Sequence, residues 1–186
     1  MVIEAFCRIA LLKSLVILSV LLLAACQVTG SASVEGKVVD TIPNLPETSK
    51  YEEFVVSGQL LPIRSIVDVN GEIVDLAVQD KRKLLVLFAT WCPDSNRALE
   101  ALNQSALLND DSIQIIAIAR EETAETVKVW RDNHDIRVPL AADPDRSIFS
   151  QFAAAGIPRF ITVSSYNKVI KMNLAEGEDP LTLIEW

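Results

Sequence analysis

The chain has 186 residues, half of them hydrophobic, and carries a formal net charge of −8 at pH 7. This length and hydrophobic content are enough for one domain with a buried core, in addition to a leader. A strongly acidic surface repels phosphate groups, so the charge argues against nucleic acids and anionic lipid headgroups as partners.

The first residues are typical of an export signal. Arg8 and Lys13 precede Leu15 to Ala25, an apolar run that is too short to span a membrane. The following Leu23-Ala24-Ala25-Cys26 resembles the lipobox of bacterial lipoproteins, which implies that Cys26 carries lipid and begins the mature protein. An uncleaved N-terminal anchor is the alternative, and both place the domain outside the cytoplasm.

We therefore predict a lipoprotein signal peptide over 1–25, a tether over 26–57 and one domain over 58–186. The tether is rich in Gly, Ser, Pro, Thr and Glu and has no sustained hydrophobic period. Gln27 stands where an Asp would resemble the inner-membrane retention signal of enteric bacteria. An outer-membrane location is therefore expected in such a bacterium.

The number and the positions of the cysteines limit the thiol chemistry that the chain can perform. Of the three cysteines, Cys7 lies in the predicted leader and Cys26 would carry lipid, which leaves Cys92 as the one free thiol of the mature protein. No disulfide can then form within the chain. In an oxidising compartment such a thiol is expected to be either buried or used.

The first structured elements are a hairpin and a buried strand. Asn70-Gly71 separates two short apolar runs between Ile66 and Val74, a pattern that predicts a β-hairpin with a type I′ turn. Asp80 to Lys83 is predicted as a charged turn. The almost wholly apolar Leu84 to Thr90 then predicts a central strand that is covered on both faces.

A helix is predicted directly after this strand, with a helical pattern from Ser95 to Leu107 and Pro93 in its first turn. Cys92 therefore lies at a helix N-terminus. Unpaired backbone N–H groups and the positive end of the helix dipole stabilise a thiolate there, whereas the charge of Asp94 opposes it.

The rest of the chain alternates strands and helices, which indicates a parallel sheet at the core. The predicted elements are a strand over Ile113–Ala119, a helix over Glu121–His134, a short helix around Phe149–Ala153, an antiparallel pair formed by Phe160–Val163 and Lys168–Asn173, and a last helix that begins at Asp179 and Pro180. No repeat or second domain is apparent.

The segment Phe88-Ala-Thr-Trp-Cys-Pro-Asp-Ser95 resembles the active-site segment of the thioredoxin superfamily, and in particular of its membrane-associated TlpA/ResA-like branch, whose usual motif is F-W-A-T-W-C-x-x-C. Gly156-Ile157-Pro158, directly before a predicted strand, resembles the cis-proline motif of the same superfamily. The resemblance covers roughly Ser57 to Trp186. It implies an α/β thioredoxin-like fold in which a central mixed sheet is flanked by helices and preceded by a β-hairpin.

The resemblance also implies a site and a class of substrate. Cys92 and Ser95 would be catalytic, and Trp91, Pro93, Ile157 and a cis Pro158 would bind the substrate. The expected activity is thiol-disulfide exchange on exported proteins that carry cysteines or disulfides. No cofactor and no metal are expected, since no Cys/His cluster is present.

The sequence departs from the family at the second cysteine, which is Ser95. Ser95 cannot attack a mixed disulfide, so an external thiol would have to release the partner. Two helper acids of the superfamily are also replaced, by Val86 and Ala98. Monothiol exchange, disulfide isomerisation and sulfenate formation all stay open. A degenerate fold that binds peptides or a partner without redox turnover is the alternative.

A peroxiredoxin is a third candidate, because Asp143-Pro-Asp-Arg-Ser147 resembles segments of that neighbouring family. Its P-x-x-x-T-x-x-C motif, however, requires Pro at Leu85 and Thr at Ala89. Both are absent, so peroxide reduction is discounted.

Overall fold

The computed structural model describes residues 51–177 and 179–186. The predicted signal peptide, the lipid site at Cys26 and the tether up to residue 50 lie outside the described residues. No helix in the described part has the length and apolar character that crossing a membrane requires.

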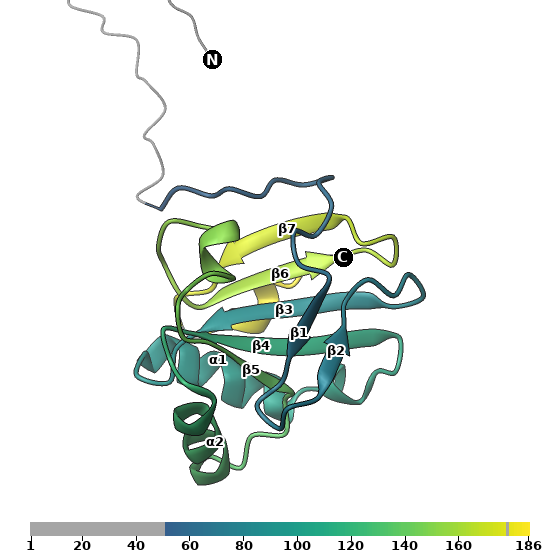
Figure 1. Cartoon of the computed structure of the whole chain (residues 1–186). Coiled ribbons are helices and arrows are strands. Elements are labelled where there is room, and N and C mark those ends of the chain that lie inside the picture. The colour runs from purple at the N-terminus through teal and green to yellow at the C-terminus, as the bar shows by residue number, and fades with distance from the viewer. Residues whose placement is uncertain (1–50, 178) are drawn as a thin grey trace, which may run out of the picture. The chain divides into compact units, whose positions relative to one another are not determined.

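A five-stranded mixed sheet forms the centre of the domain, in the order β5-β4-β3-β6-β7 (Figure 1). The strands are β3 (Arg82–Phe88), β4 (Ile113–Arg120), β5 (Leu140–Asp143), β6 (Arg159–Val163) and β7 (Val169–Leu174). Strands β3, β4 and β5 are parallel, and β6 and β7 are antiparallel to their neighbours. The predicted thioredoxin-like α/β class is confirmed.

The remaining elements are a two-stranded sheet of β1 (Ser65–Val67) and β2 (Ile73–Asp75), the helices α1 (Pro93–Gln104) and α2 (Ala124–Asn133), and the 3₁₀ turns η1 (Ala106–Asn109), η2 (Phe149–Gln151) and η3 (Pro180–Leu183).

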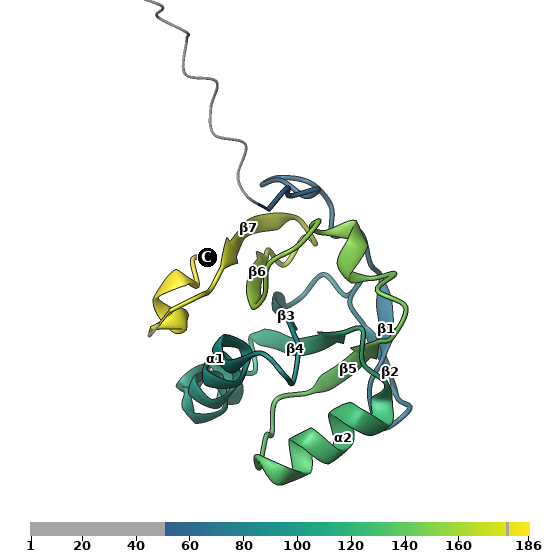
Figure 2. The same ribbon diagram turned by 90° about the vertical axis from the view of Figure 1, so that its left-hand side faces the viewer.

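The sheet separates two apolar clusters, because successive side chains of a strand point to opposite faces. Both α-helices pack on one face, where Leu99 of α1 and Trp130 of α2 meet the even-numbered side chains of β3. The other face is covered by segments that are mostly not helical, namely residues 55–76 and the stretch around Phe149 and Ile157. Figure 2 shows the helices and the β1/β2 hairpin around the sheet.

Residues 51–61, here called the N-terminal arm, run along the edge of the sheet beside β7 (Figure 1). Leu61 N–H donates to Asn167 O at 2.8 Å, and Val169 N–H donates to Gln59 O at 2.8 Å. Val55 is buried. The last residues of the predicted tether, 51–57, therefore pack against the domain.

The helix bounds differ from the predicted ones. Helix α1 ends at Gln104 and not at Leu107, because Ser105 is extended and its hydroxyl donates to Leu102 O at 2.8 Å. Helix α2 begins at Ala124 and not at Glu121, because the Thr123 side chain caps it by accepting from Thr126 N–H. The last predicted helix is only the 3₁₀ turn η3.

The strand predictions need three corrections. Strand β3 begins at Arg82, inside the predicted charged turn, because the buried Lys83 ammonium donates to Val78 O and Lys81 O at 2.6 and 3.0 Å. It also ends at Phe88, two residues before the predicted end at Thr90. The hydrophobic pattern predicts no strand over Leu140–Asp143, which forms β5.

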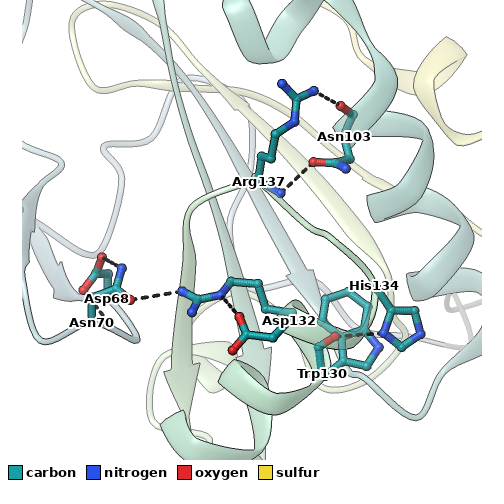
Figure 3. A network of polar contacts seen from close by, with 8 residues as sticks. Asp68, Asn70, Asn103, Trp130, Asp132, His134 and Arg137 are labelled. Carbon is teal, nitrogen blue, oxygen red and sulfur yellow. Dashed lines mark hydrogen bonds and ion pairs between the residues drawn. The ribbon is translucent and has the colours of Figure 1, made fainter.

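Polar contacts connect the helices to the neighbouring loops at the end of α2 (Figure 3). Arg131 donates to Asn70 Oδ1 of the hairpin at 3.0 Å, and Arg137 N–H donates to Asn103 Oδ1 of α1 at 2.7 Å. The ring of His134 stacks on Trp130, with centroids 4.9 Å apart. His134 therefore has a structural role at the end of α2.

Candidate functional site

Cys92 is the N-cap residue of α1, with φ −91° and ψ 119°, and Pro93 occupies the first helical position. The apolar β3 ends four residues earlier, so the strand delivers the cysteine to the helix N-terminus as predicted. Cys92 is buried, with 9% of its surface exposed, whereas the neighbouring Trp91 is 65% exposed. An exposed aromatic ring therefore lies beside a nearly covered thiol.

The proline loop reaches the same end of the sheet. Strand β6 runs antiparallel to β3, with Arg159 opposite Leu87, so the loop before β6 lies beside the end of β3. The Ile157–Pro158 peptide bond is cis, as predicted. The Cys92 thiol points at Ile157 O over 4.0 Å. Cys92 thus forms one site with Ile157 and Pro158, which lie 65 or more residues further along the chain.

Ser95 is fully buried in the first turn of α1. Its hydroxyl oxygen accepts a hydrogen bond from Ala89 N–H at 3.3 Å. Ser95 therefore fastens the end of β3 to the helix. Because it acts there as an acceptor, its own proton remains available to a second acceptor.

Asp94 forms an ion pair with Arg97 on the next turn of α1. Arg97 also donates to Gly177 O at 2.8 Å. A paired carboxylate exerts a weaker field than a free one. In the folded protein, Asp94 is therefore the partner of Arg97 and not a free charge at the start of α1.

Glu122 is a buried acid that the sequence analysis missed. Its carboxylate accepts from Thr90 N–H at 2.8 Å and from the Thr90 hydroxyl. It lies two residues beyond β4, and the carboxyl ends of the parallel β3 and β4 meet at one edge of the sheet. The sequence offered a signal for this acid. Glu122 comes just after a strand that is parallel to the strand before Cys92.

The described residues hold one thiol and no cluster of metal-ligating side chains. No group of three or more His, Cys, Asp and Glu side chains there is arranged to hold a metal ion. Cys92 is a free thiol and the one cysteine of the described part. The arrangement places one sulfur nucleophile beside the cis-proline loop, where Ile157 and Pro158 are also buried, and the described part has no second cysteine to resolve a mixed disulfide.

These features define a thioredoxin-like protein. The one cysteine of its described part lies at a helix N-terminus and faces a cis-proline loop. The chain belongs to the AhpC/TSA family, whose model matches residues 57–172. The Thr and Pro of the peroxide motif are nevertheless replaced by Ala89 and Leu85. Family membership therefore gives no reason to assign peroxide reduction.

Two similar proteins carry names that concern thiol chemistry or this fold. The thiol-disulfide oxidoreductase ResA of Bacillus cereus is 21% identical over 159 residues, which cover 84% of this chain and 86% of that protein. The thioredoxin-like protein YneN of Bacillus subtilis is 28% identical over 105 residues, which cover 54% of this chain and 62% of that protein.

Solved structures share the fold. A Bacteroides thetaiotaomicron protein superposes with a TM-score of 0.64 at 24% identity, covering 70% of this chain and 86% of that one. The thioredoxin domain of a Bacteroides vulgatus thiol-disulfide oxidoreductase gives 0.57 at 18% identity, covering 69% and 94%. At this identity the likeness concerns the fold alone.

Proposed function

We propose that the protein performs thiol-disulfide exchange on other proteins, with Cys92 as its single nucleophile. The observation that carries this proposal is the position of the Cys92 thiol at the start of α1, directed at Ile157 O beside the cis Pro158. A helix N-terminus favours a thiolate, and the thiolate is the attacking form. The names of the relatives agree with this chemistry.

In the proposed reaction the Cys92 thiolate attacks one sulfur of a substrate disulfide. One S–S bond breaks, a mixed disulfide between Cys92 and the substrate forms, and the second substrate sulfur leaves as a thiolate. An external thiol then attacks the mixed disulfide, because Ser95 cannot. The substrate backbone would pair with the chain at Ile157, while Trp91 and Pro93 would line the approach to the thiol.

We further propose that the protein works outside the cytoplasm, attached to a membrane through lipid on Cys26. The support is the leader sequence and its likeness to a lipobox. Replacement of Cys26 by Ser in the full chain should abolish incorporation of radiolabelled palmitate in a bacterial host. Incorporation that survives this replacement would exclude Cys26 as the lipid site.

The exchange reaction is tested with the reduced full chain, in which Cys7 and Cys26 are replaced by Ser so that Cys92 is the one thiol, and a peptide that contains one disulfide. We expect one covalent adduct per chain by intact mass, and none in Cys92→Ser. The adduct should disappear when a small thiol is added. A wild-type chain that forms no adduct, although the peptide reacts with glutathione under the same conditions, would instead favour the degenerate binding module.

A further inference from the structure

The N-terminal arm forms hydrogen bonds with the segment that leads into the proline loop. Phe54 N–H donates to Phe152 O at 2.8 Å, and Ala154 N–H donates to Glu52 O at 2.9 Å. Glu53 and Ala153 form an antiparallel bridge between these two bonds. The arm is therefore bridged to residues 152–154, which end four residues before the cis-proline.

A buried arginine joins the arm to the loop itself. Arg159, which directly follows Pro158, is 1% exposed. Its guanidinium donates to Ala155 O at 2.8 Å and to Gly156 O at 3.0 Å, and Nη1 donates to Glu53 Oε1 at 2.5 Å. Arg159 thus binds the carbonyls of Ala155 and Gly156 at the start of the turn. Glu53 is the acid that pairs with the charge of Arg159.

The turn also fits closely against the arm. Gly156 has φ +84°, a conformation that favours glycine. A Cβ atom on this residue would lie 3.2 Å from Tyr51 Cγ and 3.3 Å from Arg159 Nη2. The space between the arm and the turn is therefore already filled. A shift of the arm would move atoms that lie against Gly156.

We infer that Glu53 of the N-terminal arm acts through Arg159 as a positioning residue for the Gly156–Pro158 turn of the proposed peptide-binding site. This inference rests on the proposed function, since the turn presents the backbone at Ile157 to a substrate peptide. A buried guanidinium that loses its acid partner is costly, so it is expected to rearrange and to release the carbonyls it holds.

The test compares three variants of the full chain, all with Cys7 and Cys26 replaced by Ser so that Cys92 is the one thiol. Glu53→Ala removes the partner of Arg159, and Glu53→Gln keeps a side-chain oxygen that can accept from it. Glu52→Ala is the matched control, because it removes the same charge from the neighbouring exposed residue, for which the structure shows only a main-chain contact. The rate of adduct formation at Cys92 is measured with a disulfide peptide and, separately, with a small aromatic disulfide that has no peptide backbone.

We expect Glu53→Ala to slow the peptide reaction by about tenfold, since misplacement of a binding group by roughly 1 Å can cost up to about a hundredfold. Its reaction with the small disulfide should stay within about twofold of wild type, because that reagent does not use the turn. Glu53→Gln should restore most of the peptide rate, and Glu52→Ala should match wild type. Equal slowing with both reagents would overturn the inference, as would no slowing with either.

Amide hydrogen exchange separates this inference from the proposed function. If the arm positions the turn, Glu53→Ala raises the exchange of the Gly156 and Ile157 amides relative to Glu52→Ala, whether or not Cys92 reacts. Unchanged exchange there would refute the positioning role. Failure of the wild-type chain to react with the peptide, together with faster exchange in Glu53→Ala, would refute the exchange activity alone.

Discussion

The buried Glu122 and the partly buried Thr90 form a hydrogen-bonded pair just before the Trp91-Cys92 segment. The carboxylate accepts from both the N–H and the hydroxyl of Thr90, so the residue two positions before the nucleophile is held to the end of β4. The superfamily acids that the sequence lacks, at Val86 and Ala98, lie on β3 and α1. Glu122 reaches the same edge of the sheet from a different strand.

We predict that Glu122→Ala destabilises the domain by about 1–3 kcal/mol, because it leaves the partly buried Thr90 N–H without its acceptor. Urea unfolding at pH 7 measures this effect. Glu122→Gln should lose less, since one carbonyl oxygen remains. Glu100→Ala, an exposed change in α1, should stay within about 0.5 kcal/mol of wild type. Equal stability of Glu122→Ala and Glu100→Ala would show that the pair contributes nothing.

The β1/β2 hairpin shows where turn chemistry departs from the dipeptide signal. The pairing of Ile66 with Val74 confirms the predicted hairpin. The prediction of a type I′ turn is wrong. Such a turn requires positive φ at both Asn70 and Gly71, but of these two only Gly71, at +90°, has positive φ. Gly71 N–H donates to Asp68 O, and Asp68 N–H donates to Glu72 O, which gives a three-residue loop.

The Asp68 side chain explains the longer loop. Burial alone would raise the pKa of this carboxyl, but the N–H groups of Glu72, Asn70 and Gly71 and the Asn70 side chain outweigh burial and lower it from 3.8. Two of these bonds, from Asn70 N–H and Glu72 N–H to Asp68 Oδ1, are 2.8 Å long. The folded turn therefore favours the ionised acid.

We predict that Asp68→Asn lowers stability by about 1 kcal/mol at pH 7, where the charged acceptor is fully present. Because the pKa is lower in the folded than in the unfolded chain, this contribution is present above the unfolded value and is lost as the pH falls through the folded one. Urea unfolding at pH 7, 5 and 3 should therefore show a difference from wild type that shrinks toward pH 3. A difference that is constant with pH would contradict the charge argument.

Long apolar runs and cysteine placement were the reliable sequence signals. The hydrophobic pattern alone predicts strands β3 and β4 and the helix start at Cys92, because this pattern shows which side chains are buried. Strand β5 was missed because it has four residues at the sheet edge and is covered by the hairpin, where Val69 N–H donates to Leu140 O. The polar pairs Glu53–Arg159 and Glu122–Thr90 were missed because each joins residues at least 32 positions apart.

In the described domain, the central sheet has an apolar cluster on each face. The Cys92 thiol lies at one edge of this sheet. The face of the sheet that contacts Cys92 also holds Ile157 and Phe149, and the arm closes that cluster through Val55. Both site loops are thereby fixed to the same core. Cys92 is the one cysteine of the described part, so no disulfide can form within that part. In the proposed mechanism, a thiol of another molecule therefore resolves the mixed disulfide.

This topology predicts the rate law for release of a substrate. After adduct formation with a disulfide peptide, release from the wild-type chain should rise linearly with the concentration of an added thiol and fall to a negligible rate without it. Ser95→Cys places a second thiol three residues on in the first turn of α1, where it can attack the mixed disulfide within the chain. Its release should be fast without added thiol and should leave an internal disulfide between Cys92 and the introduced thiol.

Ser95→Ala is the matched control, because it removes the same hydroxyl and the bond from Ala89 N–H without adding a nucleophile. It should retain the linear dependence on thiol while losing about 1 kcal/mol of stability. Intact mass and liberated peptide thiol, followed in parallel, measure both routes. Release from the wild-type chain without any thiol would mean that some other group resolves the adduct, and the single-nucleophile mechanism would then be wrong.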